Sequence, residues 1–129
     1  MTTDRSASAD DAIRVVEQWQ ERAWGNCDLD AVDDLTTDPL LRHGPSGTEH
    51  RTHAQLKHDL RQYQRALGKP EIIVHDRTVD GDRVWSRVTM RGANLDTGEP
   101  RTLQWLQIHR VVDGRLTEVW SLYASDIVW

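Results

Sequence analysis

The hydrophobic positions change their period near Pro70. Before Pro70, apolar residues recur every three or four positions, which is typical of amphipathic helices that bury one face. After Pro70, apolar and polar residues alternate over several segments, as they do in strands that are buried on one side. The pattern therefore predicts helices in the N-terminal half and a sheet in the C-terminal half, which is an α+β fold.

Three helices are expected before this change. Asp10 or Asp11 is a suitable N-cap for the first helix, because its carboxylate can accept the free amide protons of the first turn. Asp28 opens the second helix, and the third begins at Thr52 or His53. The expected helices span residues 10–25, 29–35 and 53–67.

Two Asp-Gly pairs mark tight hairpins in the second half, at Asp80–Gly81 and Asp113–Gly114. We therefore expect a cone-shaped, curved antiparallel sheet of about four to six strands wrapped around the three N-terminal helices. A curled sheet leaves a conical cavity between the two layers, where a small apolar ligand can bind. The clearest strands are residues 72–79, 84–90, 103–112 and 116–123.

Length and charge exclude several classes of protein. The chain has 129 residues, with 16 Lys and Arg against 21 Asp and Glu and a formal net charge of −5, so we expect no nucleic-acid partner. No segment approaches the roughly 20 apolar residues of a membrane span, and no membrane partner is expected. Residues 1–9 are expected to be a disordered polar lead-in, and residues 10–129 a single domain.

The cysteine and aromatic content adds two expectations. The single cysteine, Cys27, fits a reduced, cytoplasmic protein, and it allows neither an internal disulfide nor a Cys-based zinc site. The histidine spacings match no metal-binding motif, so no metal or other cofactor is expected. Six Trp and two Tyr accompany no Phe at all. Indole rings offer flat faces and N–H donors, which favours a planar or polycyclic ligand.

Four segments, taken in their order and spacing, resemble a known family. They are W-G-N-C-D-L-D-A-V-D-D-L (Trp24–Leu35), L-L-R-H-G-P-S-G (Leu40–Gly47), V-D-G-D-R-V-W-S-R-V (Val79–Val88) and H-R-V-V-D-G-R-L-T-E-V-W (His109–Trp120). Together they resemble the nuclear transport factor 2-like superfamily, in its SnoaL-like or ketosteroid-isomerase-like branch. The resemblance implies an enclosed pocket, and a homodimer formed through the convex face of the sheet.

The same resemblance implies catalytic residues. His43 falls where ketosteroid isomerase has its general-base Asp, and an imidazole with an ordinary pKa of about 6.5 suits proton transfer at neutral pH. Gln107 and Gln20 fall where that enzyme has oxyanion-hole groups, and each can donate an amide hydrogen bond. His109 is a candidate second acid or base. Asp126 is the carboxylate nearest to the position where SnoaL-like cyclases and limonene-epoxide-hydrolase-like enzymes have an Asp.

Further candidates would bind the substrate. Alternation places residues 105, 107 and 109 on one face of their strand, and the resemblance turns that face toward the cavity. The remaining substrate-binding candidates are Trp19, Tyr63, Trp105, Ser121, Tyr123 and Trp129.

We therefore expect a cofactor-independent acid/base enzyme of small-molecule biosynthesis, a cyclase or isomerase acting on a mostly apolar, polyketide-like or other secondary metabolite. A non-catalytic small-molecule-binding or assembly protein of the same fold is one alternative, favoured by the absence of the family Asp at Ala124 and Ser125. An epoxide-opening cyclase or epoxide hydrolase is a second alternative, and it requires carboxylates around one water. The expected partners are a small apolar or polycyclic metabolite and a second copy of the chain.

Overall fold

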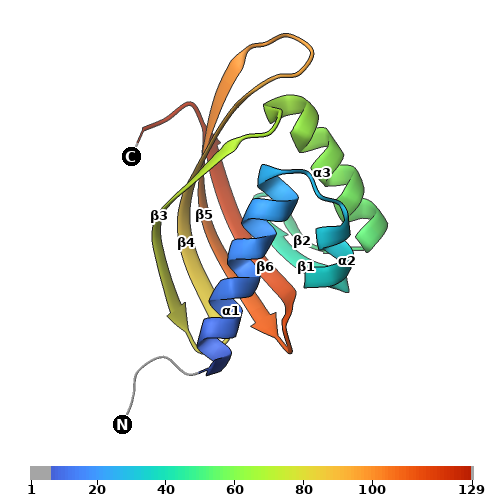
Figure 1. The fold of residues 1–129 in the computed structure, drawn as a ribbon, viewed down its shortest axis with the longest axis vertical. Helices are drawn as coiled ribbons and strands as arrows, with labels where there is room; N and C mark the ends of the chain where they lie inside the picture. Colours follow the sequence, from blue (N-terminus) through green and yellow to red (C-terminus); the bar gives the residue numbers. More distant parts are fainter. Residues whose placement is uncertain (1–6, 129) are drawn as a thin grey trace.

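A curved sheet wraps around helices packed on its concave side in the computed structural model, which describes residues 7–128 (Figure 1). The expected α+β fold is confirmed. In chain order the elements are α1 (Ala7–Gln18), the π-helix η1 (Trp19–Gly25), α2 (Asp30–Leu35), β1 (Thr36–Gly44), β2 (Gly47–Arg51), α3 (His53–Leu67), β3 (Glu71–Asp80), β4 (Arg83–Ala93), β5 (Pro100–Val112) and β6 (Arg115–Ser125).

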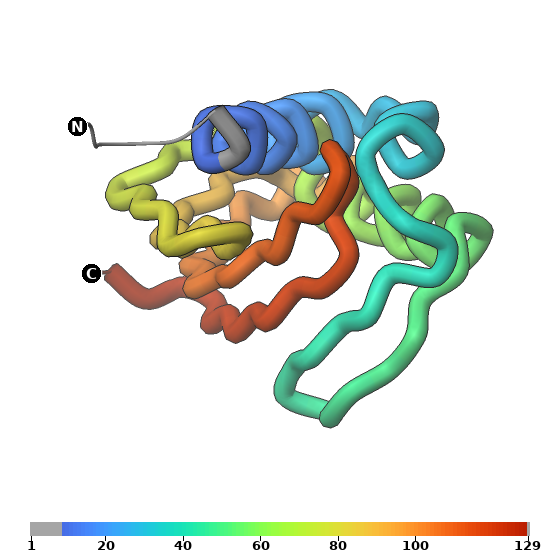
Figure 2. Tube along the Cα trace, turned by 90° about the horizontal axis from the view of Figure 1, so that it is seen from below, coloured from blue at the N-terminus to red at the C-terminus, as the bar shows by residue number. Residues whose placement is uncertain are grey.

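The sheet has six strands in the order β2-β1-β6-β5-β4-β3. The predicted hairpins join β3 to β4 and β5 to β6 as antiparallel pairs. The prediction of a purely antiparallel sheet is wrong at one pair, since β1 runs parallel to β6. These strands are far apart in the sequence, so no tight turn imposes antiparallel pairing on them. Figure 2 shows the β1–β2 hairpin projecting from the body of the molecule.

The first helix ends at Gly25 as predicted, but it begins earlier and its last part is not α-helical. It begins at Ala7 instead of Asp10, so the last residues of the expected disordered lead-in are helical, and Ala9 is buried. Its C-terminal part, Trp19–Gly25, is a π-helix. A π-turn has more residues per turn than an α-turn, and it shifts the side chains that follow. Trp19 and Gln20, the first two residues of this segment, are both buried.

The other helices begin as the sequence predicts. The carboxylate of Asp28 accepts a hydrogen bond from the Asp30 amide at the start of α2. At the start of α3, Thr52 and Gln55 form a capping box, in which each side chain accepts from the other residue's backbone N–H.

The apolar core has two parts. One lies between α1, α2 and the sheet, around the fully buried Val16, Val32 and Leu116. The other lies under the C-terminal end of α3 and includes Leu67 and Met90. The cavity lies between these parts. None of the helices within residues 7–128 is long and apolar enough to cross a membrane.

Gly92 on β4 lies against the backbone of Leu67 at the end of α3. A Cβ placed on Gly92 would lie 1.9 Å from the Leu67 carbonyl oxygen, which is far inside contact distance. We predict that Gly92→Ala lowers the free energy of unfolding by about 2–3 kcal/mol, because strand and helix must separate to admit the methyl group. Urea denaturation followed by tryptophan fluorescence measures this change.

Gly25→Ala is the matched control for Gly92→Ala. A Cβ on Gly25 would meet its nearest neighbour at 3.6 Å, an ordinary contact. We expect this variant to unfold within about 0.5 kcal/mol of the wild type. Equal stability of the two variants would contradict the packing of α3 on β4 at this point.

Candidate functional site

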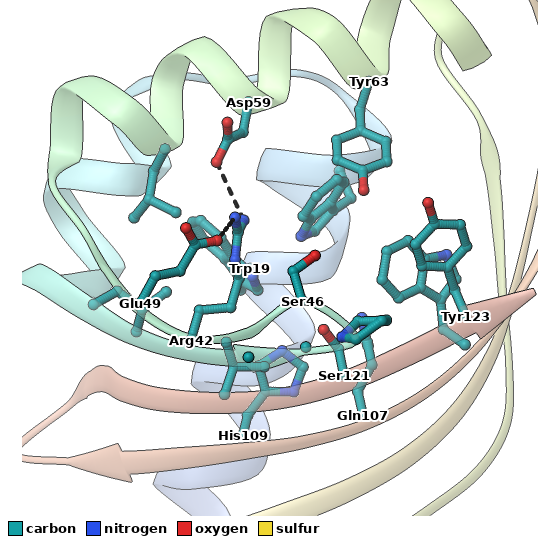
Figure 3. A pocket seen from close by; sticks show the side chains of 18 residues that line it. Trp19, Arg42, Ser46, Glu49, Asp59, Tyr63, Gln107, His109, Ser121 and Tyr123 are labelled. Carbon is teal, nitrogen blue, oxygen red and sulfur yellow. Dashed lines mark hydrogen bonds and ion pairs between the residues drawn. The ribbon is translucent and has the colours of Figure 1, made fainter.

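A cavity of about 380 Å³ lies between the helices and the concave face of the sheet (Figure 3). Aromatic side chains form one wall, glutamine and histidine from β5 form the floor, and charged side chains from β1, β2 and α3 surround the mouth. This volume lies within the range of small-molecule sites.

The aromatic wall consists of Trp24, Tyr63, Trp105 and Tyr123. The rings of Trp105 and Tyr123 stack at 4.7 Å, and Tyr63 meets Trp24 edge-on at 4.9 Å. The indole Nε1 of Trp105 is buried and has no hydrogen-bond partner among the described residues. Burial raises the pKa of Tyr63, which therefore keeps its phenolic proton at neutral pH. The wall thus offers flat apolar faces together with N–H and O–H donors, as the sequence predicts.

His109 lies on the floor of the cavity and is 1% exposed. Its Nδ1 has no hydrogen-bond partner among the described residues. Burial, with a smaller contribution from the positive charge of Arg77, lowers the pKa of His109 to about 4. The imidazole is therefore neutral at physiological pH and can accept a proton from a bound molecule.

Gln107 lies two residues before His109 on the same strand face and also lines the cavity. Its Oε1 accepts a hydrogen bond of 3.3 Å from Nε2 of Gln20, a residue of the π-helix. The Oε1 of Gln20 in turn accepts from the guanidinium of Arg77 on β3. The structure thus brings together the two glutamines that the sequence predicts as oxyanion donors, and it adds an arginine behind them.

The mouth of the cavity is charged but internally paired. Arg42 contacts Glu49 at 2.6 Å and Asp59 at 3.2 Å, and Arg51 contacts Asp59 at 2.7 Å. The hydrogen bond from Arg42 lowers the pKa of Glu49, so this carboxylate is ionised at neutral pH. Ser46, in the turn of the β1–β2 hairpin, completes the rim (Figure 3).

Most of the predicted substrate-binding residues reach the cavity. Trp19, Tyr63, Trp105, Gln107, Ser121 and Tyr123 all line it, and so does His109. Gln20 lies behind Gln107 and reaches the ligand space through it. Trp129 lies outside the described residues.

His43 does not lie in the cavity. In the register of β1 and β6, Arg42 is paired with Val119 on the inner face, and His43 is paired with Trp120 on the outer face. The ring of His43 stacks on Trp120 at 5.0 Å, and its Nε2 lies 2.6 Å from Glu118. The predicted general base thus lies on the far side of the sheet, because adjacent strand residues point to opposite faces.

Asp126 is also outside the cavity. It is exposed and follows the end of β6 in a left-handed conformation, with φ of 60°. Its backbone N–H donates to the Thr102 carbonyl at 2.8 Å. The structure therefore does not bring Asp126 together with His109 as an acid/base pair. Among residues 7–128, no three His, Cys, Asp or Glu side chains lie together in a way that would hold a metal ion.

Several residues of the site were not predicted from the sequence, among them Trp24, Arg42 and Arg77. The ring of Trp24 contacts those of Tyr63 and Trp105, and its helical spacing is a usable signal. Arg42 lies on the same face as the buried Leu40, but Leu41 is apolar as well, so alternation alone does not select this face. Alternation does not indicate Arg77 either, because a bulge between Val74 and Asp76 shifts the alternation of β3 by one residue.

The comparisons with known proteins agree with this fold. The sequence profile of the SnoaL-like domain matches residues 16–119. The match spans most of the chain, so the chain belongs to the SnoaL-like family, whose fold is nuclear transport factor 2-like. At the level of sequence, no curated protein matches the chain.

Solved structures of the same shape carry several activities in their names. A protein described as a SnoaL-like polyketide cyclase from Jannaschia sp. CCS1 has a TM-score of 0.78 and 19% identity over 97% of this chain and 92% of its own. IdmH of Streptomyces antibioticus, described as a polyketide cyclase, has a TM-score of 0.73 and 23% identity, over 89% of this chain and 91% of its own. An LEH-like epoxide hydrolase of M. tuberculosis has a TM-score of 0.73 and 25% identity, over 90% of this chain and 84% of its own. Fold similarity alone does not select among these reactions.

Proposed function

We propose that this protein is a cofactor-independent acid/base catalyst that removes a proton from carbon next to a carbonyl group of a flat, mostly apolar metabolite. One observation carries the proposal: a buried imidazole with an unpartnered Nδ1 shares the floor of an aromatic cavity with an amide donor. His109 is the base and Gln107 the oxyanion donor. This retains the cyclase or isomerase activity expected from the sequence and moves the base from His43 to His109.

The geometry of β5 supports a division of labour between His109 and Gln107. Residues two apart on a strand are about 7 Å apart and point the same way, so they can contact neighbouring atoms of one ligand. His109 accepts the proton from the C–H bond, and the electron pair moves to the carbonyl oxygen. Gln107 donates a hydrogen bond to the enolate oxygen as its charge develops. Reprotonation at another carbon gives an isomer, and attack on a second carbonyl closes a ring.

The low pKa of His109 is compatible with this role. It keeps the imidazole in its proton-accepting form throughout the neutral range. The negative charge that forms on the adjacent substrate oxygen stabilises the imidazolium during the reaction, since opposite charges interact strongly in a dry site.

Turnover of 5-nitrobenzisoxazole tests the proposed function without knowledge of the natural substrate. In this planar bicyclic probe, a base removes the proton on carbon, the N–O bond breaks, and a coloured cyanophenolate forms. We expect the wild-type protein to exceed free imidazole by about 100-fold or more per base. Saturating 2-acetonaphthone should suppress the reaction by occupying the cavity. A rate equal to that of free imidazole, or no suppression, would contradict the proposal.

A non-catalytic binding protein is the second candidate, and the mouth of the cavity favours it. The carboxylates that line the cavity, Glu49 and Asp59, are both held by arginines, and they leave His109 without an acidic partner. This reading predicts tight binding of 2-acetonaphthone with no turnover of the benzisoxazole. The same pairing makes epoxide opening the least favoured reaction, because it needs carboxylates free to act on a water.

We also propose that two copies associate through the convex face of the sheet. This face carries an apolar groove of about 670 Å³. Trp85, Leu106 and Leu122 are 47%, 45% and 58% exposed there, an unusual concentration of apolar side chains for a free surface. The groove lies on neighbouring strands, so a two-fold axis through it would let the same apolar patch of each copy cover the other.

Leu106→Arg tests the dimer. Two buried arginines facing each other across a two-fold interface are strongly unfavourable, so we expect a monomer of 14.9 kDa in place of a species twice that mass. Light scattering coupled to size-exclusion chromatography measures the mass. Leu95→Arg, at an exposed position in the β4–β5 loop, is the control and should remain dimeric. A monomeric wild type would refute the interface.

A further inference from the structure

A row of polar side chains crosses the inner face of the sheet beneath the cavity. The register pairs Arg77 of β3 with Ser86 of β4, Ser86 with Gln107 of β5, and Gln107 with Ser121 of β6. Ser86 and Gln107 are each 6% exposed. Polar groups are costly at such depth unless they form hydrogen bonds, so the orientation of each one matters.

Only one member of this row has a fixed hydrogen-bonding polarity. The hydroxyls of Ser86 and Ser121 can donate or accept, and a glutamine amide can rotate to present either its oxygen or its nitrogen. The guanidinium of Arg77 can only donate. Arg77 therefore imposes a direction on any amide that it contacts.

The donor character of Arg77 fixes the amide orientation of Gln20 and, through it, that of Gln107 at the cavity. Because Arg77 donates, Gln20 must turn its Oε1 toward it. The Nε2 of Gln20 is then the atom that faces Gln107, at 3.3 Å from its Oε1. Gln107 is left with Nε2 as the atom to present to a ligand. Both amide orientations follow from the chemistry of the arginine.

We propose that Arg77 is a positioning residue: through Gln20 it holds Gln107 as a hydrogen-bond donor, so that the site selects a ligand with an accepting oxygen at this point. The inference rests on the proposed function only in assuming that ligands occupy this cavity. Arg77 itself is kept from the ligand by Gln20 and Gln107. It lies 3.7 Å from Glu17, and this distant pairing leaves its donors available to Gln20.

Gln20→Glu is the decisive substitution. A glutamate at position 20 still accepts from Arg77, but it has no proton to give to Gln107. Gln107 must then rotate and donate its Nε2 to the glutamate, which turns its Oε1 toward the cavity. The variant should therefore reverse the polarity of the floor while it keeps the size and the apolar wall of the cavity.

Two ligands of the same shape report that polarity. 2-Acetonaphthone carries a carbonyl oxygen, and 2-isopropenylnaphthalene has a methylene group in its place. Because the ketone gains one hydrogen bond, we expect the wild type to bind it roughly tenfold more tightly than the hydrocarbon. Titrations followed by tryptophan fluorescence measure both dissociation constants. Gln20→Glu should abolish or reverse this preference and leave the affinity for the hydrocarbon unchanged.

Variants of the arginine separate positioning from packing. Arg77→Lys keeps a donor toward Gln20 and should keep most of the preference, whereas Arg77→Met should reduce it to about twofold or less. Arg91→Met, at an exposed position on β4, is the control. The carbonyl stretching band of bound ketone should lie at low frequency in the wild type, Arg77→Lys and Arg91→Met. It should move to higher frequency in Arg77→Met and Gln20→Glu.

The outcomes distinguish the inference from the proposed function. If Gln20→Glu and Arg77→Met keep the wild-type preference and carbonyl band, Arg77 does not position Gln107.

If neither probe binds to the wild type, the proposed small-molecule site is wrong, and side-chain amide exchange by NMR tests the inference without a ligand. The Gln20 amide should then exchange slowly in the wild type and Arg77→Lys and rapidly in Arg77→Met. Equal exchange in all three would overturn the inference, and if Arg77→Met does not fold, the Gln20→Glu comparison decides.

Discussion

Replacing His109 with Asn lowers kcat/KM for 5-nitrobenzisoxazole by about 100- to 1,000-fold, the usual effect of removing a general base. Asn retains a polar group of similar size on the cavity floor, so the aromatic wall and Gln107 stay in place. The KM for the probe, and the affinity for 2-acetonaphthone, should therefore change less than threefold. Initial rates measured by absorbance of the phenolate product give both parameters, and the loss should fall on kcat.

His43→Asn is the matched control for this experiment. His43 is the base that the sequence predicts, but its ring stacks on Trp120 and contacts Glu118 on the outer face of the sheet. We expect kcat/KM of this variant to stay within about twofold of the wild type. If His43→Asn loses activity and His109→Asn keeps it, the assignment of the base to the cavity floor is wrong.

The second large effect is a loss of stability in mild acid. In the unfolded chain His109 has its ordinary pKa of about 6.5, and in the folded protein its pKa is lowered to about 4. Between these values the unfolded state binds a proton that the folded state does not. The contribution of neutral His109 to stability is therefore complete above pH 6.5 and is lost as the pH falls from 6.5 to 4. The pKa difference corresponds to about 3 kcal/mol.

Urea denaturation at several pH values from 7 to 4 measures this loss. Carboxylates such as Glu49 also release stability in acid, so the informative quantity is the difference between the wild type and His109→Leu. Leu fills the buried site without a titratable group. The wild type should lose about 3 kcal/mol more than the variant over this range. Parallel pH profiles for the two proteins would show that His109 is not buried as described.

Much of the fold and part of the candidate site could be predicted from the sequence. The helical spacing predicted where α3 begins, and the two Asp-Gly pairs predicted the β3–β4 and β5–β6 hairpins. Strict alternation along β5 put Trp105, Gln107 and His109 on one face, and that face does line the cavity. These features follow from local backbone geometry, which a short stretch of sequence determines.

The position of His43 relative to the cavity could not be predicted, because local geometry does not decide which face of a strand is the inner one. Alternation near His43 defines two faces of β1, but only the pairing of Arg42 with Val119 on β6 decides which of them is the inner face. On β3, a single bulge before Asp76 turns Arg77 inward, and nothing in its sequence marks that shift. In the first helix, the segment Trp19–Gly25 is a π-helix, which the helical spacing of its apolar residues does not indicate.

The sequence by itself determined the order of the elements, the hairpin turns, and which residues of one strand lie on the same side. The tertiary structure alone decided which side faces the cavity, and therefore that His109 is buried on the cavity floor and that Arg77 lies behind the two glutamines. The physical reason is that a strand repeats every two residues. One added residue, or one choice of partner strand, exchanges its inner and outer faces and leaves the pattern along the chain almost unchanged.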